Sequence, residues 1–394
     1  LPLEAGAPVR VDVGYQPAEV GLSTVELWRP QLNEYRSYVG LDVHARTTQG
    51  CVIDADTGEI VHRKLSASTP EIVAWVASLP GPQIATYEAG PTGFSLYRQL
   101  LAAGIGCQVA APSKLQRPVG DRVKTDTRDA EHLAKLLRLG QIVVVTVPTV
   151  EAETVRDVVR AREDTRQVLM GNRHQLSKLL LRHGLVYDEG AAWTGKHDRW
   201  LREHRTSGDR SFTTAFDAYY EAVTQTVARR DRLDKVIEDL AANSSFTPMV
   251  DRLGCLRGVS ALTGLALAVE IGDWRRFTGK TIGSFVGLVP SEYSSGQSRV
   301  QGGITKTGNS HVRRLLVEAA WQHRRDYRPT PTSVMQARWE KAPALARLRG
   351  QEGNVRLHRQ WVAFTARRKR PVVANTAIAR ELAGWCWSLA VMDD

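Results

Sequence analysis

Four acidic residues in the first third of the chain lie where the sequence predicts a strand or a helix to begin or end. Asp42 interrupts the apolar stretch SYVGLDV, and Glu88 ends the stretch ATYE. Asp126 and Asp129 lie three residues apart at the start of the helical stretch DTRDAEHLAKLLRLG, so they face the same side. Four carboxylates that converge on one end of a sheet would repel one another unless a cation neutralised them.

Magnesium is the cation that best suits such a site. It binds a few carboxylates and completes its shell with water and phosphate oxygens, and two ions roughly 3.5 to 4 Å apart could clamp a phosphoryl transfer. Structural explanations also exist, because Asp126 and Asp129 could cap their helix and Asp42 could be a satisfied edge residue. Taken together on a basic protein, the four carboxylates favour a site for Mg²⁺, with Mn²⁺ as the alternative.

A second candidate site is the polar stretch SEYSSGQSRVQGGITKTGN at residues 291–309, with four serines, two threonines and four glycines. It runs into the basic helical stretch HVRRLLVEAAW. The composition predicts a phosphate-handling loop, and it leaves open a plain surface loop or a loop that holds a nucleophile. The predicted phosphate-binding residues are Arg299, Lys306, Arg313 and Arg314, with Arg275 and Arg276 widening the basic surface.

A third stretch, RGVSALTG at residues 257–264, lies between apolar helical segments. A turn of this kind offers backbone N–H groups to a phosphate at a helix N-terminus, although a plain helix-turn-helix core element would look the same. The stretch GGITKTG lacks the spacing of a nucleotide-binding P-loop, so ATP hydrolysis is not expected.

Composition and charge favour a nucleic-acid partner over a membrane. The chain has 394 residues, with 53 Lys and Arg against 42 Asp and Glu, a net charge of +11 and an isoelectric point near 9.7. No apolar run approaches the roughly 18 residues of a membrane span. The cysteines, which form no CxxC pair, predict reduced core thiols of a cytoplasmic protein; they are Cys51, Cys107, Cys255 and Cys386.

The apolar patterning predicts the elements that position these residues. Residues 1–36 lack a sustained period and are predicted to be an N-terminal extension outside the folded domains. Three antiparallel strands within residues 37–65 precede alternating helices and strands. This order predicts a mixed sheet covered by helices at residues 37–147, as in a ribonuclease H-like fold.

Beyond this sheet domain the sequence predicts mainly helix. Residues 148–250 carry apolar residues at three- and four-residue steps on both sides of a Gly/Trp/Asp-rich segment near 184–212. Two long helices follow from this pattern, either as a spacer or as an antiparallel hairpin that also dimerises the protein. Residues 251–394 predict a compact, mainly helical C-terminal domain that carries the RGVSALTG turn and the serine-rich loop.

Five long blocks carry a resemblance to a known family, and they stand in the right order and spacing over about residues 37–390. They are YVGLDVHA, TYEAGPTGFSLYRQL, APSKLQRPVGDRVKTDTRDAEHLAKLLR, LRGVSALTGLALAVEIGDWRRF and GLVPSEYSSGQSRVQGGITKTGNSHVRRLLVEAAW. Together they resemble the DEDD transposases of bacterial insertion sequences, the insertion-sequence one-ten and Piv invertase family. Thr127 stands where the family pattern leads us to expect an arginine, and residues 1–36 lie outside the blocks.

The resemblance implies an α/β RuvC-like domain with a DEDD metal site, an α-helical coiled-coil region and a C-terminal transposase domain. It maps the family's carboxylates onto Asp42, Glu88, Asp126 and Asp129, and it places the catalytic serine in the block SEYSSG. We predict Ser295 as the nucleophile because the glycine after it permits a close approach to phosphate, and Ser294 as the alternative. Because a serine needs activation, metal held by the carboxylates is the economical hypothesis.

The activity implied by the resemblance is DNA recombination guided by a structured bridge RNA that the element encodes. Its partners would be donor DNA, target DNA and this RNA, and cutting paired strands favours a dimer or tetramer. One rival is a metal-dependent nuclease or junction resolvase in which water attacks, and another is a catalytically silent nucleic-acid-binding protein. The blocks around Ser295 argue against the first, and the complete carboxylate set argues against the second.

Overall fold

The computed structural model describes residues 34–115, 125–206, 208–295, 298–328 and 333–393. Its internal contacts divide the chain into two compact units, Leu1–Val147 and Pro148–Asp394. Nearly all of the predicted N-terminal extension lies outside the described residues.

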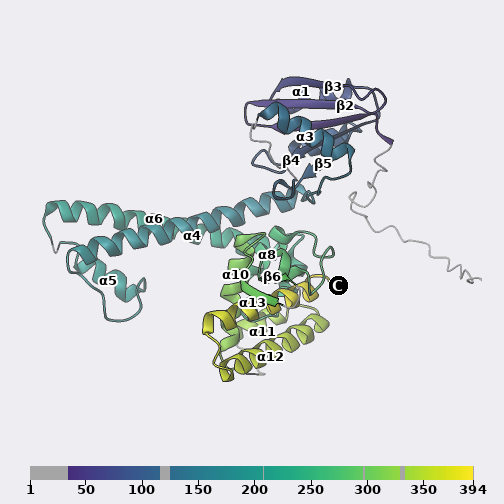
Figure 1. Cartoon of the computed structure of the whole chain (residues 1–394). Helices are drawn as coiled ribbons and strands as arrows, with labels where there is room; N and C mark the ends of the chain where they lie inside the picture. Colours follow the sequence, from purple (N-terminus) through teal and green to yellow (C-terminus); the bar gives the residue numbers. More distant parts are fainter. Residues whose placement is uncertain (1–33, 116–124, 207, 296–297, 329–332, 394) are drawn as a thin grey trace, which may run out of the picture. The chain divides into compact units, whose positions relative to one another are not determined.

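Unit 1 contains a mixed five-stranded sheet in the order β3-β2-β1-β4-β5 (Figure 1). Strands β1, β2 and β3 are antiparallel neighbours, whereas β4 and β5 run parallel to β1. The predicted mixed α/β sheet is thus confirmed, and it is consistent with a RuvC-like fold. The elements of unit 1 are β1 (Ser37–Val43), β2 (Thr47–Asp54), β3 (Ile60–Ser66), α1 (Thr69–Ala77), β4 (Gln83–Glu88), α2 (Ser95–Ala102), β5 (Gly106–Ala110), η2 (Pro112–Lys114) and α3 (Asp126–Arg138).

The two faces of the sheet are covered by different helices, because successive residues of a strand point to opposite faces. Tyr38 belongs to the buried cluster formed with Ala130 of α3, whereas Val39 belongs to the cluster formed with Leu100 of α2. Gly40 therefore lies on the α3 face, where a Cβ would come within 2.0 Å of the Ala130 carbonyl oxygen. Only glycine permits this approach, and it brings the start of α3 close to the end of β1.

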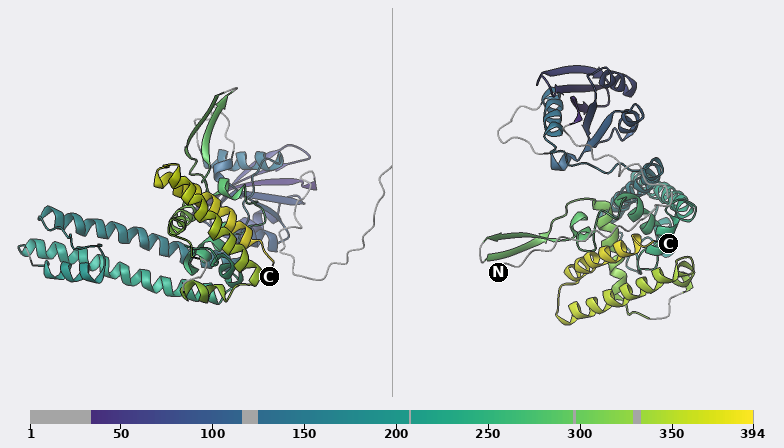
Figure 2. Two further views of the ribbon diagram at one scale, coloured as in Figure 1. Left: turned by 90° about the horizontal axis from the view of Figure 1, so that it is seen from below. Right: turned by 90° about the vertical axis from the view of Figure 1, so that its right-hand side faces the viewer.

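Unit 2 begins with two long helices, α4 (Val150–Arg182) and α6 (Arg210–Ala242), which lie side by side (Figures 1 and 2). Glu151 accepts a hydrogen bond from Ser245, and Arg162 pairs with Asp234 further along α4. Since the partners move backward along the chain as α4 advances, the two helices are antiparallel. The prediction of two long helices is confirmed, and α5 (Gly195–Glu203) lies between them in the sequence.

The remainder of unit 2 is mainly helical, with one two-stranded sheet among its described residues. Its largest buried cluster joins Leu256, Leu316, Leu357 and Leu382, so segments far apart in the sequence share one core. The elements are α7 (Thr247–Leu253), α8 (Ala261–Ile271), α9 (Ile282–Phe285), β6 (Pro290–Ser295), β7 (Ser298–Ile304), α10 (Ser310–Ala320), η3 (Trp321–Arg324), α11 (Ser333–Trp339), α12 (Ala344–Ala366) and α13 (Pro371–Ala390).

Two expectations about the chain's environment can be compared with these elements. In the described part of the chain, no helix has the length and apolar character required to cross a bilayer. All four cysteines are free thiols; Cys51, Cys255 and Cys386 are buried, and Cys107 is partly buried.

Candidate functional site

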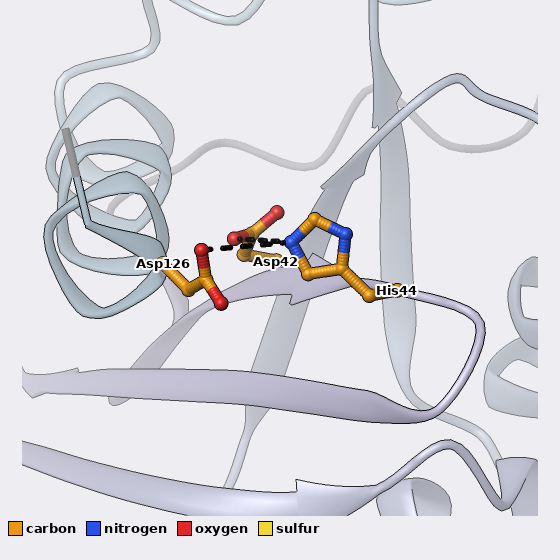
Figure 3. A group of neighbouring side chains, drawn as sticks. All are labelled: Asp42, His44 and Asp126. Carbon is orange, nitrogen blue, oxygen red and sulfur yellow. Dashed lines mark hydrogen bonds and ion pairs between the residues drawn. The ribbon is translucent and has the colours of Figure 1, made fainter.

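A cluster of ionisable side chains lies where β1 ends and α3 begins (Figure 3). Nε2 of His44 lies 3.1 Å from Asp42 Oδ2 and 3.8 Å from Asp126 Oδ1. The ligand atoms of these three residues all lie within 4.8 Å of one another, a spacing that could hold a metal ion. We call Asp42, His44 and Asp126 the sheet-edge cluster.

The strand register places Glu88 on the same face of the sheet as Asp42. Leu41 of β1 is paired with Tyr87 of the parallel strand β4, so the next residue of each strand, Asp42 and Glu88, is also matched. Ile84 of β4 packs on the α3 face, and by alternation Glu88 points to that face as well. The structure therefore gives Glu88 a position beside the sheet-edge cluster, although its ligand atoms are not among those within 4.8 Å.

The two aspartates of α3 lie in its first turn, as the sequence predicts. Thr125 caps the helix by accepting a hydrogen bond from the Arg128 backbone N–H at 3.4 Å. Because this threonine already fills the capping position, neither Asp126 nor Asp129 is the N-cap. The structural explanation for these two aspartates is therefore reduced to their favourable interaction with the helix dipole. Asp126 is exposed and Asp129 is partly buried.

His44 is the member of this cluster that the sequence analysis missed. It follows β1 directly, two residues after Asp42, and its backbone N–H donates to the Thr47 carbonyl at 3.0 Å. The signal for it was available in YVGLDVHA, because residues two apart along a strand point to one face. A histidine two residues after a candidate metal ligand is therefore a candidate member of the same site.

Among the described residues, burial and neighbouring carboxylates disfavour the charged form of Asp42 in the sheet-edge cluster. Burial raises the pKa of Asp42 above its ordinary value, and the charges of Asp126 and Asp129 raise it further. Among the described residues, His44 opposes this shift through its charge and its hydrogen bond. A carboxylate that is disfavoured in its charged form by neighbouring carboxylates suits a bound cation.

The donor set fits a hard divalent ion. Carboxylate oxygens are the ligands that Mg²⁺ and Mn²⁺ prefer, and an imidazole nitrogen suits softer transition metals better. With two aspartates in the cluster and Glu88 and Asp129 beside it, oxygen donors predominate. His44 is then better placed to hold Asp42 by a hydrogen bond than to act as the main ligand.

Most of the serine-rich stretch forms two paired strands, β6 and β7, and its last residues, 305–309, lie outside them, which corrects the expectation of a loop throughout. Strands β6 and β7 pair in an antiparallel register that matches Tyr293 with Val300 and Ser294 with Arg299. In Figure 2 this hairpin projects from the helices of unit 2. A two-stranded ribbon with both faces in solvent needs no apolar alternation, which explains why the sequence pattern did not reveal the strands.

Both candidate nucleophiles are exposed near the tip of this hairpin. Ser294 Oγ donates to Glu292 Oε1 at 2.8 Å, whereas the Ser295 carbonyl accepts a bond from Ser298 Oγ at 3.3 Å. The glycine after Ser295 lies outside the described residues, so its predicted backbone freedom is not described. Under the hairpin's base a cavity of about 1010 Å³ is lined by Gly302, Gly303, Phe364, Arg380 and Trp385, among others.

The predicted phosphate-binding cations have varied surroundings in unit 2. Arg313 donates to the carbonyls of Val286 and Thr307 at 3.0 and 2.7 Å, and Arg314 pairs with Glu163 and with Glu318. These contacts give both arginines a structural role, and contact with phosphate remains a prediction for them.

The other four predicted cations lie around the hairpin or before α9. Arg276 donates to the Ile271 carbonyl and lies over the rings of Phe277 and Phe285. Exposed Arg275 pairs with Asp393 at 2.6 Å. Lys306 is exposed, with a positive φ of 55°. The side chain of Arg299 lies outside the described part of the structure.

A second acidic group, deep in unit 2, has the opposite character. Glu270 of α8 has a side chain only 2% exposed and accepts two hydrogen bonds from Arg160, at 2.9 and 3.0 Å. Its carboxylate also accepts a hydrogen bond of 2.8 Å from the side-chain amide of Asn309, the N-cap of α10. His311 Nδ1 lies 3.7 Å from Glu270 Oε1. Burial opposes the charged form, but His311, Arg160 and Arg156 outweigh it and lower the pKa of Glu270 to about 2.

The fold and the sheet-edge cluster together define a class of protein. A mixed sheet consistent with a RuvC-like fold, with carboxylates gathered where β1 and β4 end, is the arrangement of metal-dependent enzymes that act on phosphodiesters. The helical unit 2 adds a surface rich in arginine.

Comparison with known proteins identifies the family. The model of the Transposase IS116/IS110/IS902 family matches residues 250–334, and a transposase model of the DEDD type matches residues 39–184. The chain is 38% identical to the putative transposase y4qE of Sinorhizobium fredii over 77% of this chain and 74% of that protein. It is 31% identical to the transposase for insertion sequence element IS1533 of Leptospira borgpetersenii, over 84% and 98% of the two chains.

The chain belongs to the IS110/IS116/IS902 family of DEDD transposases. Another relative is the transposase for insertion sequence element IS1111A of Coxiella burnetii, 25% identical over 72% of this chain and 76% of that protein. Membership implies an enzyme that cleaves and recombines DNA, and the DEDD type implies a divalent metal.

Proposed function

We propose that this insertion-sequence transposase is a Mg²⁺-dependent DNA recombinase, guided by a structured bridge RNA, that exchanges strands through a serine-linked intermediate. The observation that carries the proposal is the meeting of Asp42 with Asp126, with Glu88 matched beside Asp42 on the same face of the sheet. RNA guidance rests on the resemblance to the family and on the net charge of +11, which suits a second polyanion besides DNA.

Asp42, Glu88, Asp126 and Asp129 are the residues that would hold the metal. When bound, Mg²⁺ or Mn²⁺ would polarise the scissile phosphate and stabilise negative charge on the leaving oxygen. His44 holds the Asp42 carboxylate through the 3.1 Å contact, and so restricts the directions in which its other oxygen can point.

Ser295 is the proposed nucleophile. Its Oγ forms a bond to phosphorus, the bond from phosphorus to one sugar oxygen breaks, and the serine proton passes to a nearby acceptor while the sugar oxygen gains a proton. The phosphoserine ester keeps the energy of the broken bond, so a hydroxyl of the exchanged strand can displace the serine. Ser294 is the alternative nucleophile, and the Glu292 carboxylate that accepts its hydrogen bond would be its proton acceptor.

This mechanism requires unit 1 and unit 2, from one chain or from two copies, to act on the same phosphate. A dimer or tetramer is the natural assembly for a reaction that cuts paired strands. We propose that the hairpin of α4 and α6 joins the copies as a coiled coil, because it carries exposed apolar side chains at Val168, Met170, Leu181 and Val236.

The proposal is tested by looking for a protein–DNA adduct that survives denaturation. The full chain is incubated with Mg²⁺, donor DNA, target DNA and the bridge RNA transcribed from its own element, and the products are separated on a denaturing gel. The expected result is an adduct in the wild type that is absent in Ser295→Ala and absent when the RNA is omitted. Ser291→Ala is the matched control, since it removes a serine hydroxyl of the same hairpin that donates to the Gly303 carbonyl and not to Ser295, and it should retain the adduct.

The outcomes divide the candidates. An adduct lost in Ser294→Ala and retained in Ser295→Ala would move the nucleophile by one residue. Cleavage without any adduct would contradict the covalent step and favour a nuclease or junction resolvase that uses water. An adduct that forms equally well without RNA would contradict guidance.

A further inference from the structure

A small cavity of unit 2 collects an unusual number of arginines. Its volume is about 380 Å³, within the range of roughly 300 to 1,000 Å³ typical of pockets for small ligands. Five guanidinium groups line it, three from α4, one from α6 and one from α10; they are Arg162, Arg166, Arg173, Arg230 and Arg314. These helices come from three parts of the sequence. We call the space that the five arginines line the arginine cavity.

The start of α8 supplies another wall of the arginine cavity. Ser260, the N-cap of α8, and Thr263 both line it, and their hydroxyl oxygens lie 3.1 Å apart. These residues belong to the stretch RGVSALTG, for which the sequence predicts a possible contact with phosphate. The helix N-terminus therefore adds hydroxyl donors and a favourable dipole to a wall that is already basic.

Four of the five arginines have carboxylate partners in the structure. Arg162 binds Asp234, Arg166 binds Glu163, Arg230 binds Asp231, and Arg314 binds both Glu163 and Glu318. Each of these guanidinium groups also has donors beyond the two that a carboxylate engages, because a guanidinium carries five N–H groups. The paired arginines can therefore still donate to an anion in the cavity.

Arg173 is the arginine whose charge is not compensated. Among the described residues, no carboxylate lies within ion-pairing distance of it, and its Nε is buried without a hydrogen-bond acceptor. Its guanidinium lies over the ring of Trp193, 4.9 Å from the centroid. Burial lowers the pKa of Arg173, and the nearby charge of Arg230 lowers it further. A half-buried cation beside another cation is costly unless an anion joins it.

We propose that the arginine cavity is a binding site for a phosphodiester group of a nucleic-acid strand. The two non-bridging oxygens of a phosphodiester can accept paired hydrogen bonds from the planar guanidinium group, and the phosphate would supply a negative charge beside Arg173. The inference rests on the proposed function only in taking DNA or RNA as the source of the phosphate. It assigns the middle of the α4–α6 hairpin a direct contact with that strand, far in sequence from the β6–β7 hairpin that carries Ser294 and Ser295.

The test measures binding without cleavage, so that it is independent of the serine mechanism. Affinity of the full chain for a labelled DNA duplex, and separately for a labelled single-stranded RNA, is measured in EDTA over a series of salt concentrations. Arg173→Met keeps an apolar stem beside Trp193 and removes the charge. We expect about tenfold weaker binding and a salt slope reduced by about 0.9 for duplex DNA or about 0.7 for single-stranded RNA, the effect of one lost phosphate contact.

Arg229→Met is the matched control, because Arg229 is exposed on α6 next to Arg230 and does not line the arginine cavity. It should change affinity less than twofold, and Arg173→Lys should restore most of the binding. Loss confined to the DNA arm or to the RNA arm identifies the strand that supplies the phosphate. Equal losses in Arg173→Met and Arg229→Met, or no loss in either arm with a protein that melts like the wild type, would overturn the proposal.

Discussion

Two acidic sites of the chain, the sheet-edge cluster of unit 1 and Glu270 of unit 2, differ in their surroundings. In the sheet-edge cluster, Asp42 and Asp126 meet beside His44, and burial together with neighbouring carboxylates raises the pKa of Asp42. In unit 2, Glu270 is buried among arginines and a histidine that lower its pKa to about 2. Within the described part of the chain, cations surround Glu270, whereas the basic side chain that contacts Asp42 and Asp126 is His44.

This difference separates a structural acid from a functional one. Glu270 connects α4, through Arg160, with the N-cap of α10, the helix that follows the serine hairpin. Its contacts therefore link α4 to the start of α10. The sheet-edge cluster has the opposite property, since burial and neighbouring carboxylates disfavour the charged form of Asp42, which a bound divalent cation would favour.

The largest expected effect is on activity, from Asp42→Asn. Removing one ligand charge should lower strand cleavage by about 10³-fold or more, because metal stabilisation of a phosphoryl transfer is worth several kcal/mol. The free energy of unfolding should stay the same or rise, since the raised pKa means that the charged form of Asp42 disfavours folding at neutral pH. Cleavage assays check the predicted loss of activity, and urea unfolding checks the predicted stability. An Asp42→Asn variant that is clearly less stable than the wild type would contradict the contrast drawn between Asp42 and Glu270.

The next effect is on stability, from Glu270→Gln. Loss of this buried charge leaves Arg160 and Arg156 uncompensated, so the free energy of unfolding should fall by roughly 3 kcal/mol. Glu318→Gln is the matched control, because Glu318 is exposed and also pairs with an arginine of α10, and it should cost at most about 1 kcal/mol. Equal losses in the two variants, measured by urea unfolding, would remove the distinction between buried and exposed pairs.

The smallest effect is on the pH dependence of stability, and its sign differs between the two groups. Because the pKa of Glu270 is lowered in the fold, its contribution is complete above the ordinary glutamate value of 4.5 and is lost as the pH falls toward about 2. Because the pKa of Asp42 is raised, stability is lost as the pH rises from its ordinary value of 3.8 through the raised one. Unfolding measured from pH 2.5 to 7 should therefore show a shallower acid loss in Glu270→Gln and a smaller loss on raising the pH in Asp42→Asn. Unchanged pH profiles in both variants would contradict the assigned shifts.

Much of unit 1 could be predicted because its signals are local. The strands at 37–43 and 47–54 match β1 and β2, and the predicted helix at DTRDAEHLAKLLRLG matches α3 except at its last residues. Alternation within a strand and the acidic first turn of a helix depend on neighbouring residues, which the sequence displays directly. The same reasoning could have identified His44, two residues after Asp42.

Unit 2 was less predictable because its partners are distant. Arg314 was predicted to bind phosphate, but its carboxylate partner Glu163 lies about 150 residues earlier on α4. The strands of the β6–β7 hairpin were not predicted because they are exposed on both faces and carry no apolar period. Neither feature leaves a mark within a short window of sequence.

The sequence by itself determined the residue types for the chemistry: acidic groups at element ends, a serine-rich block and an excess of arginine. It also determined the mixed sheet, through the order of its strands and helices. Only the tertiary structure decided which charges are compensated. The pairing of β1 with β4 and the close approach of α3 at Gly40 bring carboxylates together, and the packing of α4 against α8 and α10 surrounds Glu270 with cations while Arg173 has no carboxylate partner within the described residues. Since electrostatic energy depends on distance and burial, and the sequence fixes neither between distant residues, these roles follow from the fold alone.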